Sequence, residues 1–172
     1  MNMLSHAKVT YVLCGHSERR QHHHETNDMI AAQCSAAMDV ELLPILCVGE
    51  TSQDRAAKKE KEVVRAQVET MLAATSERLT ANNCMIAYEP VWAIGTGNTA
   101  QPADVQEMHA YIRSLLPAQI RDGVRIIYGG SIKSTNAQSL FALPDVDGGL
   151  VGASSLDADE FARIVDAATS VA

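Results

Sequence analysis

The sequence predicts an α/β protein in which parallel strands alternate with helices. Five times along the chain, a short apolar run is followed by a glycine-containing or polar turn and then by an amphipathic stretch. Each unit takes roughly 35 residues and no linker-like stretch separates the units, so we expect a single domain over residues 1–172. Such alternation favours right-handed crossovers, either in an open doubly wound sheet or in a β/α barrel.

The strands are predicted from short runs of apolar, β-branched and aromatic residues. Pro44 is compatible with a strand because it stands near the start of its run. The predicted strands cover residues 9–14, 42–48, 84–88, 124–128 and 148–151.

The helices are predicted from capping residues and from apolar residues at helical spacing. Thr26 is a plausible cap for a helix over residues 27–38, and Pro102 suits the first turn of a later helix. Further helices are expected over residues 54–74 and 136–143, and a last one from Asp157, where Glu160 completes a capping-box pattern. The expected buried positions are Ala57, Val64, Val68, Met71, Val105, Met108, Ile112, Leu115, Phe161, Ile164 and Val165.

Composition excludes several classes of protein. Of the 172 residues, 47% are hydrophobic and 20% charged, which is typical of a folded globular chain. The net charge of −7, with no basic stripe, argues against a nucleic-acid partner. No apolar run reaches membrane-span length and the start lacks the long apolar region of a signal peptide, so we expect no membrane partner and a cytoplasmic location.

Cysteine and histidine spacing gives little support for a metal site. The four cysteines lie 20, 13 and 37 residues apart, without the close pairs of zinc or redox motifs, and we expect them to be reduced and mostly buried. The tract His22, His23 and His24 lacks the i, i+4 spacing of helical metal ligands, which favours a solvated loop. We therefore expect no metal.

The most informative stretch is residues 87–97. Glu89 ends a predicted strand, Pro90 pushes it towards an extended conformation, and Gly95 and Gly97 free the following loop. A carboxylate at the carboxyl end of a buried strand, beside a hinged loop, suits a general base under a lid. The alternative is a strand-ending acid with an ordinary surface loop, which composition alone favours.

Four segments resemble the signature segments of the triosephosphate isomerase family, in that family's order and spacing. They are residues 15–20, 88–97, 128–131 and 150–152, and the similarity runs from about residue 9 to 161. The resemblance implies a TIM (β/α)8 barrel of which about five β/α units are present, the carboxyl-terminal five of eight. The Asn-x-Lys segment and the loop that builds the family's homodimer belong to the units without a counterpart here.

The resemblance also implies an activity and its residues. The family interconverts dihydroxyacetone phosphate and D-glyceraldehyde 3-phosphate through an enediolate, without a cofactor, in glycolysis and gluconeogenesis. Residues 91–100 match its mobile lid. By position, the catalytic residues are His16 and Glu89, the substrate-binding residues are Gly95, Ser131, Gly152 and Ala153, and the supporting residues are Ser17, Glu18 and Tyr128.

Two local departures from the family pattern are visible. Ala153 stands where a second glycine is usual, and we expect a modest loss of phosphate affinity if that position needs positive φ or a close phosphate approach. Asn98 stands where the far hinge of the lid often carries lysine, which affects lid rates more than chemistry.

The leading interpretation is an isomerase of this family truncated at its amino-terminal side, and the activity of the 172-residue chain alone is an open question. Three alternatives stand beside it. The chain can be an inactive half-barrel that still binds phosphorylated ligands, or a fragment that works only with a complementing chain. An unrelated doubly wound α/β protein also fits the strand and helix pattern, although the four matched segments argue against it.

Overall fold

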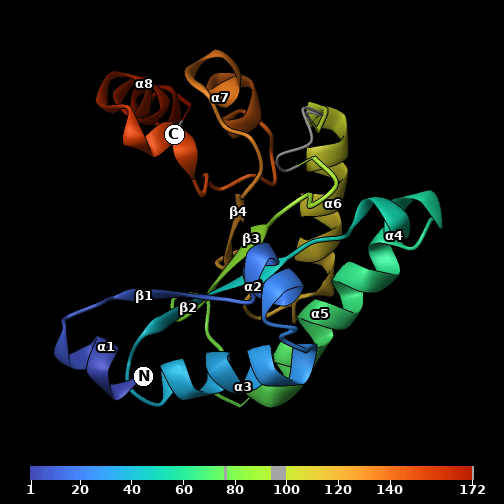
Figure 1. Cartoon of the computed structure of the whole chain (residues 1–172), viewed down its shortest axis with the longest axis vertical. Coiled ribbons are helices and arrows are strands. Elements are labelled where there is room, and N and C mark those ends of the chain that lie inside the picture. Colours follow the sequence, from blue (N-terminus) through green and yellow to red (C-terminus); the bar gives the residue numbers. More distant parts are fainter. Residues whose placement is uncertain (76, 94–99, 172) are drawn as a thin grey trace.

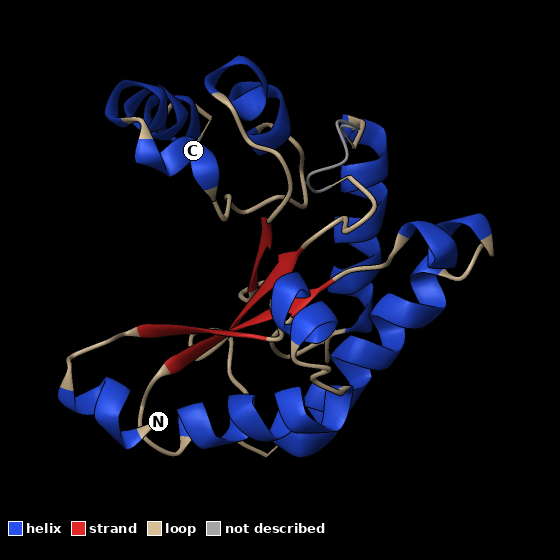
Figure 2. Ribbon diagram, viewed as in Figure 1, coloured by secondary structure: helices blue, strands red, loops and turns tan. Residues whose placement is uncertain are grey.

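The computed structural model describes residues 1–75, 77–93 and 100–171. Within these residues, a four-stranded sheet has the order β1-β2-β3-β4, and every pair of neighbours is parallel. The strand directions turn progressively across the sheet (Figure 2), because right-handed strand twist accumulates from one strand to the next. The strands are β1 (Tyr11–Cys14), β2 (Leu43–Val48), β3 (Met85–Tyr88) and β4 (Arg125–Tyr128).

The predicted fifth strand over residues 148–151 is wrong as an extended strand. Only Gly149 pairs with the sheet, through one isolated parallel bridge to Tyr128. Two hydrogen bonds hold it there: Tyr128 N donates to Gly148 O at 3.0 Å, and Leu150 N donates to Tyr128 O at 2.8 Å. Two successive glycines have little β propensity and no side chains to pack, so pairing stops after one bridge.

The helices alternate with the strands as the sequence predicts. Thr26 caps α3, and its side-chain oxygen accepts a hydrogen bond from Met29 N. The helices are α1 (Asn2–His6), α2 (Ser17–His22), α3 (Asn27–Met38), α4 (Ser52–Ala56), α5 (Glu60–Thr75), α6 (Pro102–Leu115), α7 (Ser134–Phe141), the 3-10 helix η1 (Ala153–Leu156) and α8 (Ala158–Thr169).

The single helix predicted over residues 54–74 is wrong, because two helices stand there. Helix α4 ends at Ala56, Lys58 adopts a φ of 57°, and α5 starts at Glu60. A left-handed residue cannot continue a right-handed helix, so the chain changes direction at this point. As a consequence Ala57 is exposed, whereas Val64, Val68 and Met71 are buried as predicted.

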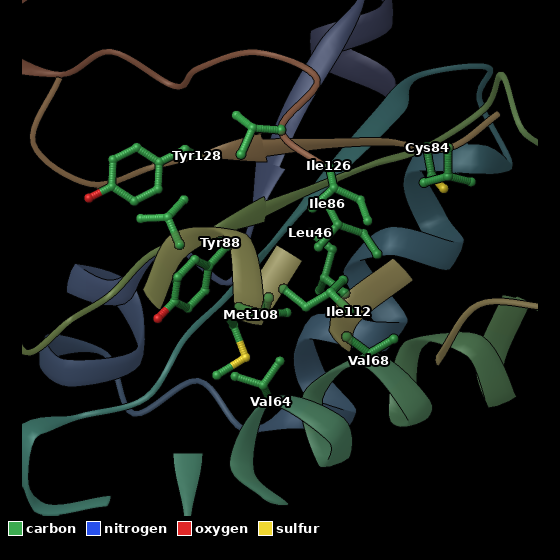
Figure 3. Close-up of a cluster of buried hydrophobic side chains, with 14 of the residues drawn as sticks. Leu46, Val64, Val68, Cys84, Ile86, Tyr88, Met108, Ile112, Ile126 and Tyr128 are labelled. Carbon is green, nitrogen blue, oxygen red and sulfur yellow. The ribbon is translucent and has the colours of Figure 1, made fainter. Parts of the chain in front are cut away.

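Helices α3, α5 and α6 pack along one side of the sheet, and α7 and α8 lie together at its other end (Figure 1). The main core fills the space between the sheet and these helices and contains Leu46, Ile86, Ile126, Val68 and Ile112 (Figure 3). A smaller cluster on the opposite face of the strands consists of Ile45, Cys47, Ala87 and Ile127. Among the described residues, no helix is both long enough and apolar enough to cross a membrane.

Helix α8 is only partly docked. Ile164 is buried, but the predicted burial of Phe161 and Val165 is wrong, since they are 40% and 45% exposed. Leu115 of α6, also predicted as buried, is half-buried. The capping box predicted for α8 forms only in part: Asp157 accepts a hydrogen bond from Glu160 N, while the Glu160 carboxylate binds Ser134 instead. Helix α8 therefore contacts mainly α7 and η1.

Candidate active site

The candidate site lies at the carboxyl ends of the strands, where β/α proteins gather their chemistry. Two glycines make the close approach of these loops possible. Gly15 follows β1 with a φ of 78°, a conformation that favours glycine, and directs the chain into His16. Gly49 follows β2, and a side chain there would overlap the carbonyl oxygen of Glu89.

Glu89 and His16 are brought together from two loops that are far apart in sequence. His16 Nε2 lies 3.1 Å from Glu89 Oε1, and Ser17 N donates to Glu89 Oε2 at 2.9 Å. The Glu89 residue is 2% exposed, and the His16 side chain is 33% exposed. Both carboxylate oxygens are therefore held, and the imidazole keeps one side open to solvent.

Opposing effects set the proton affinity of Glu89. Burial raises the pKa of Glu89 above its usual value. His16, the Ser17 amide and the Arg20 guanidinium each favour the ionised form and limit the rise. The net direction is upward, towards the pKa of a better proton acceptor.

Arg20 fixes the loops around this pair, a role that sequence reasoning missed. Its guanidinium donates to Gly15 O at 2.8 Å, to Asn27 Oδ1 at 2.8 Å and to Cys47 O at 3.0 Å. These bonds connect the end of β1, the start of α3 and the end of β2. The only sequence signal was its place in the segment 15–20.

A cavity of about 530 Å³ opens beside Glu89 and His16. Leu13 and Glu18 line one part of it, and the loops after β4 and around η1 line the rest. The lining residues of these loops are Gly129, Gly130, Ser131, Ile132, Lys133, Leu150, Val151, Gly152, Ala153 and Ser154. Of the residues predicted to bind substrate, Ser131, Gly152 and Ala153 therefore lie at one cavity, while Gly95 lies outside the described residues.

Positive φ is not required at the two positions of the family's glycine pair. Gly152 has a φ of −88°, and a Cβ placed on it would meet no atom within 4 Å. Ala153 starts η1 and is not among the described residues with positive φ. One of the two reasons for the expected affinity loss therefore falls away, and close phosphate approach remains. The other departure, Asn98, lies outside the described residues.

The three supporting residues take different positions. Ser17 is buried and holds Glu89 through its amide. Glu18 is exposed and borders the cavity. Tyr128 is buried at the end of β4 and does not line the cavity itself, but its phenol oxygen fills the space that a side chain at Gly130 would need.

A second buried carboxylate anchors the start of the loop that follows Glu89. Glu50 is fully buried, and its Oε1 accepts hydrogen bonds from Tyr88 at 3.0 Å and from Trp92 Nε1 at 2.7 Å. Arg55 lies 3.4 Å from the same oxygen and 4.4 Å from the centre of the Trp92 ring. Sequence reasoning missed this anchor, although Glu50 follows a predicted strand just as Glu89 does.

Among the described residues, no cluster of three or more His, Cys, Asp or Glu side chains is arranged to hold a metal ion. The described site instead offers a buried carboxylate, an imidazole and a cavity bordered by glycine- and serine-rich loops. These features, on a parallel α/β sheet, define a β/α-barrel type of enzyme with its site at the carboxyl ends of the strands.

Comparison with known proteins identifies the family. Residues 1–168 match the protein-family model described as triosephosphate isomerase. The triosephosphate isomerase of Xanthomonas euvesicatoria is 46% identical, with 98% of this chain and 68% of that protein covered. Those of Bordetella pertussis and Pseudomonas syringae are 47% and 48% identical, covering 96% and 97% of this chain and 66% and 67% of their own lengths. The chain belongs to the triosephosphate isomerase family and spans about two thirds of these relatives.

Proposed function

We propose that this chain interconverts dihydroxyacetone phosphate and D-glyceraldehyde 3-phosphate by proton transfer through an enediolate. The observation that carries the proposal is the Glu89–His16 pair, 3.1 Å apart, at the cavity formed with the Ser131 and Gly152 loops. The proposal is supported by a possible proton acceptor, a possible hydrogen-bond donor and loops that can bind phosphate, all at one cavity.

Glu89 is the proposed base. In the first step its carboxylate takes a proton from the carbon that bears the hydroxyl group. The electrons of that C–H bond form a C=C bond, and the π electrons of the carbonyl group move onto its oxygen to give an enediolate. The hydroxyl proton then passes to the former carbonyl oxygen, and return of the carbon-bound proton from Glu89 to the neighbouring carbon, with a C=O bond formed at the first carbon, completes the isomerisation. A raised pKa helps this step, and burial of Glu89 supplies it.

His16 is the proposed electrophile. A neutral imidazole that binds the Glu89 carboxylate through Nε2 carries its proton on that nitrogen. The same N–H can donate to the enediolate oxygen once Glu89 turns to the substrate carbon, which agrees with the established acid–base assignment of this family. The amide of Ser17 and the first turn of α2 follow directly.

The loops of Ser131, Gly152 and Ala153 are the proposed phosphate cradle, together with Gly95. Backbone amides bind a phosphate dianion without a neighbouring arginine. In the described part of the chain, the amides of Ser131 and Ile132 have no hydrogen-bond partner, so they are available to an anion at the cavity.

The remaining roles follow from the same family. Residues 91–100 are the proposed lid, with Tyr128 and Ser131 as its latch, and closure would exclude water from the enediolate. In the family, the lysine of the Asn-x-Lys segment neutralises substrate charge, and Glu18 is the proposed counterpart of the residue that partners this lysine. We further propose a cytoplasmic location, a place in glycolysis and gluconeogenesis, and a homodimeric assembly of the longer family members.

The direct test is turnover of glyceraldehyde 3-phosphate by the purified 172-residue chain, with Glu89→Gln prepared in the same way. Glutamine keeps the shape of the side chain but cannot take the proton, so we expect at least a ~100-fold lower rate. The matched variant also measures any contaminating host isomerase. Equal rates in both proteins would show that this chain does not catalyse the reaction.

Exposed apolar side chains favour two alternative hypotheses. Tyr11 and Leu13 of the edge strand β1 are 44% and 43% exposed, and Phe161 and Val165 of α8 are also exposed. A chain that is inactive but retains phosphate binding would behave as a half-barrel binding module. Activity that appears only on mixing with a chain carrying the first three β/α units of a relative would instead favour the complementation reading.

A further inference from the structure

The cavity beside Glu89 has an uneven charge. Its lining includes two carboxylates, Glu18 and Glu89, and a single side chain of the Lys or Arg type, Lys133. A phosphate dianion that enters such a cavity is repelled by ionised carboxylates and attracted by that ammonium group. Among the described residues that line this cavity, Lys133 is therefore the one whose side chain carries a permanent positive charge near neutral pH.

The backbone of Lys133 is held firmly at the cavity. Its amide donates to Asn136 Oδ1 at 2.8 Å, and Asn136 Nδ2 donates to Ser131 O at 3.0 Å. On the other side, Ser154 Oγ donates to Ile132 O at 2.8 Å and ties this loop to η1. The two loops of the candidate phosphate cradle are thus joined, with Lys133 at the start of α7.

The side chain of Lys133 is exposed. Within the described residues it forms no ion pair, and the nearby carboxylate of Glu160 is bound to Ser134 N and Oγ. A lysine ammonium on its flexible four-carbon stem can move towards a ligand that arrives at the adjacent amides. Its charge is therefore free to serve an incoming anion.

We propose that Lys133 is a further substrate-binding residue, whose ammonium group neutralises the phosphate of the triose phosphate at the Ser131–Ser154 side of the cavity. This inference rests on the proposed function and adds a side-chain cation to a cradle otherwise built from backbone amides. The contribution is electrostatic and partly solvent-exposed, so it should be moderate and salt-dependent.

The test is binding of inorganic phosphate and of glycerol 3-phosphate, a three-carbon phosphate monoester that cannot isomerise, measured by calorimetric titration of the full chain. Lys133→Met removes the charge, and Lys133→Arg restores it. Lys59→Met is the matched control, since Lys59 is also exposed and lies outside the cavity lining, before α5.

We expect Lys133→Met to weaken both ligands about 3- to 10-fold at low salt, with a smaller effect at about 0.2 M salt. Lys133→Arg should stay within about 2-fold of the parent, and Lys59→Met likewise. Unchanged affinity in Lys133→Met, or an equal loss in Lys59→Met, would overturn the role of Lys133 alone. Failure of the parent chain to bind either ligand would overturn this role together with the proposed phosphate cradle.

Discussion

At the scale of single residues, the candidate site depends on how Glu89 is balanced between burial and its partners. Burial alone would favour the protonated form, which cannot accept a proton. His16 and the Ser17 amide favour the ionised carboxylate and limit the rise of its pKa. Substrate must displace these bonds, so the resting contacts belong to the unliganded state rather than to the reacting one.

At His109 in the core, burial again favours the neutral form. It is fully buried in α6, with its ring centroid 5.8 Å from that of Tyr88 and 6.3 Å from that of Tyr128. Nδ1 lies 3.1 Å from Asp145 O, and Nε2 has no partner among the described residues. Burial lowers the pKa of His109 to about 4.

This lowered pKa predicts acid sensitivity of the fold. The unfolded chain takes up the proton near pH 6.5 and the folded chain only near pH 4, so stability falls as the pH drops through this window. At about pH 5 the loss amounts to about 2 kcal/mol. Urea unfolding of the parent and of His109→Gln between about pH 7.5 and 5 should show this loss only in the parent. Parallel stability curves would rule the contribution out.

At the scale of elements, the connection after β3 is anchored by Glu50 rather than by packing alone. Tyr88 precedes Glu89 and Trp92 follows it, and both donate to the same Glu50 oxygen. Arg55 of α4 joins the group and also pairs with Asp104 of α6 at 2.6 Å. The position of Glu89 is therefore set from both sides along the chain.

Removal of this anchor should be costly. Glu50→Ala leaves the buried Tyr88 hydroxyl and the Trp92 indole N–H without their acceptor, and we expect a loss of about 2–4 kcal/mol in the free energy of unfolding. Glu50→Gln should lose less, because its amide oxygen still accepts both bonds. Denaturant unfolding followed by the fluorescence of Trp92, the single tryptophan, measures both effects. Equal stability of the two variants would contradict the role of the shared oxygen.

Element types were predictable from sequence where local signals agree with burial. Apolar runs located β1 to β4 to within a few residues, and Thr26 was correctly identified as the cap of α3. The break at Lys58 was not predictable, because the charged run around it is compatible with one continuous helix. A strand was predicted over residues 148–151, but the glycine pair has little β propensity and the structure has only one bridge there, at Gly149.

At the scale of the whole molecule, the family and the gathering of site residues at one edge followed from motif order and strand polarity. The side-chain contacts within the site could not be predicted in the same way. Sequence alone could not show that Arg20 spans three elements or that Glu50 anchors Trp92, because both depend on loops far apart in the chain. The exposure of Phe161 and Val165 was also not predictable, because helical spacing identifies an apolar face but not the element that covers it.

The central claim is that Glu89 moves a proton at carbon, and isotope exchange tests it most directly. Dihydroxyacetone phosphate is incubated in D₂O with the purified chain, and deuterium at its hydroxymethyl carbon is followed by proton NMR. We predict incorporation with the parent chain and only background incorporation with Glu89→Gln. Equal incorporation with both proteins, or none with a parent chain that binds inorganic phosphate, would contradict the account.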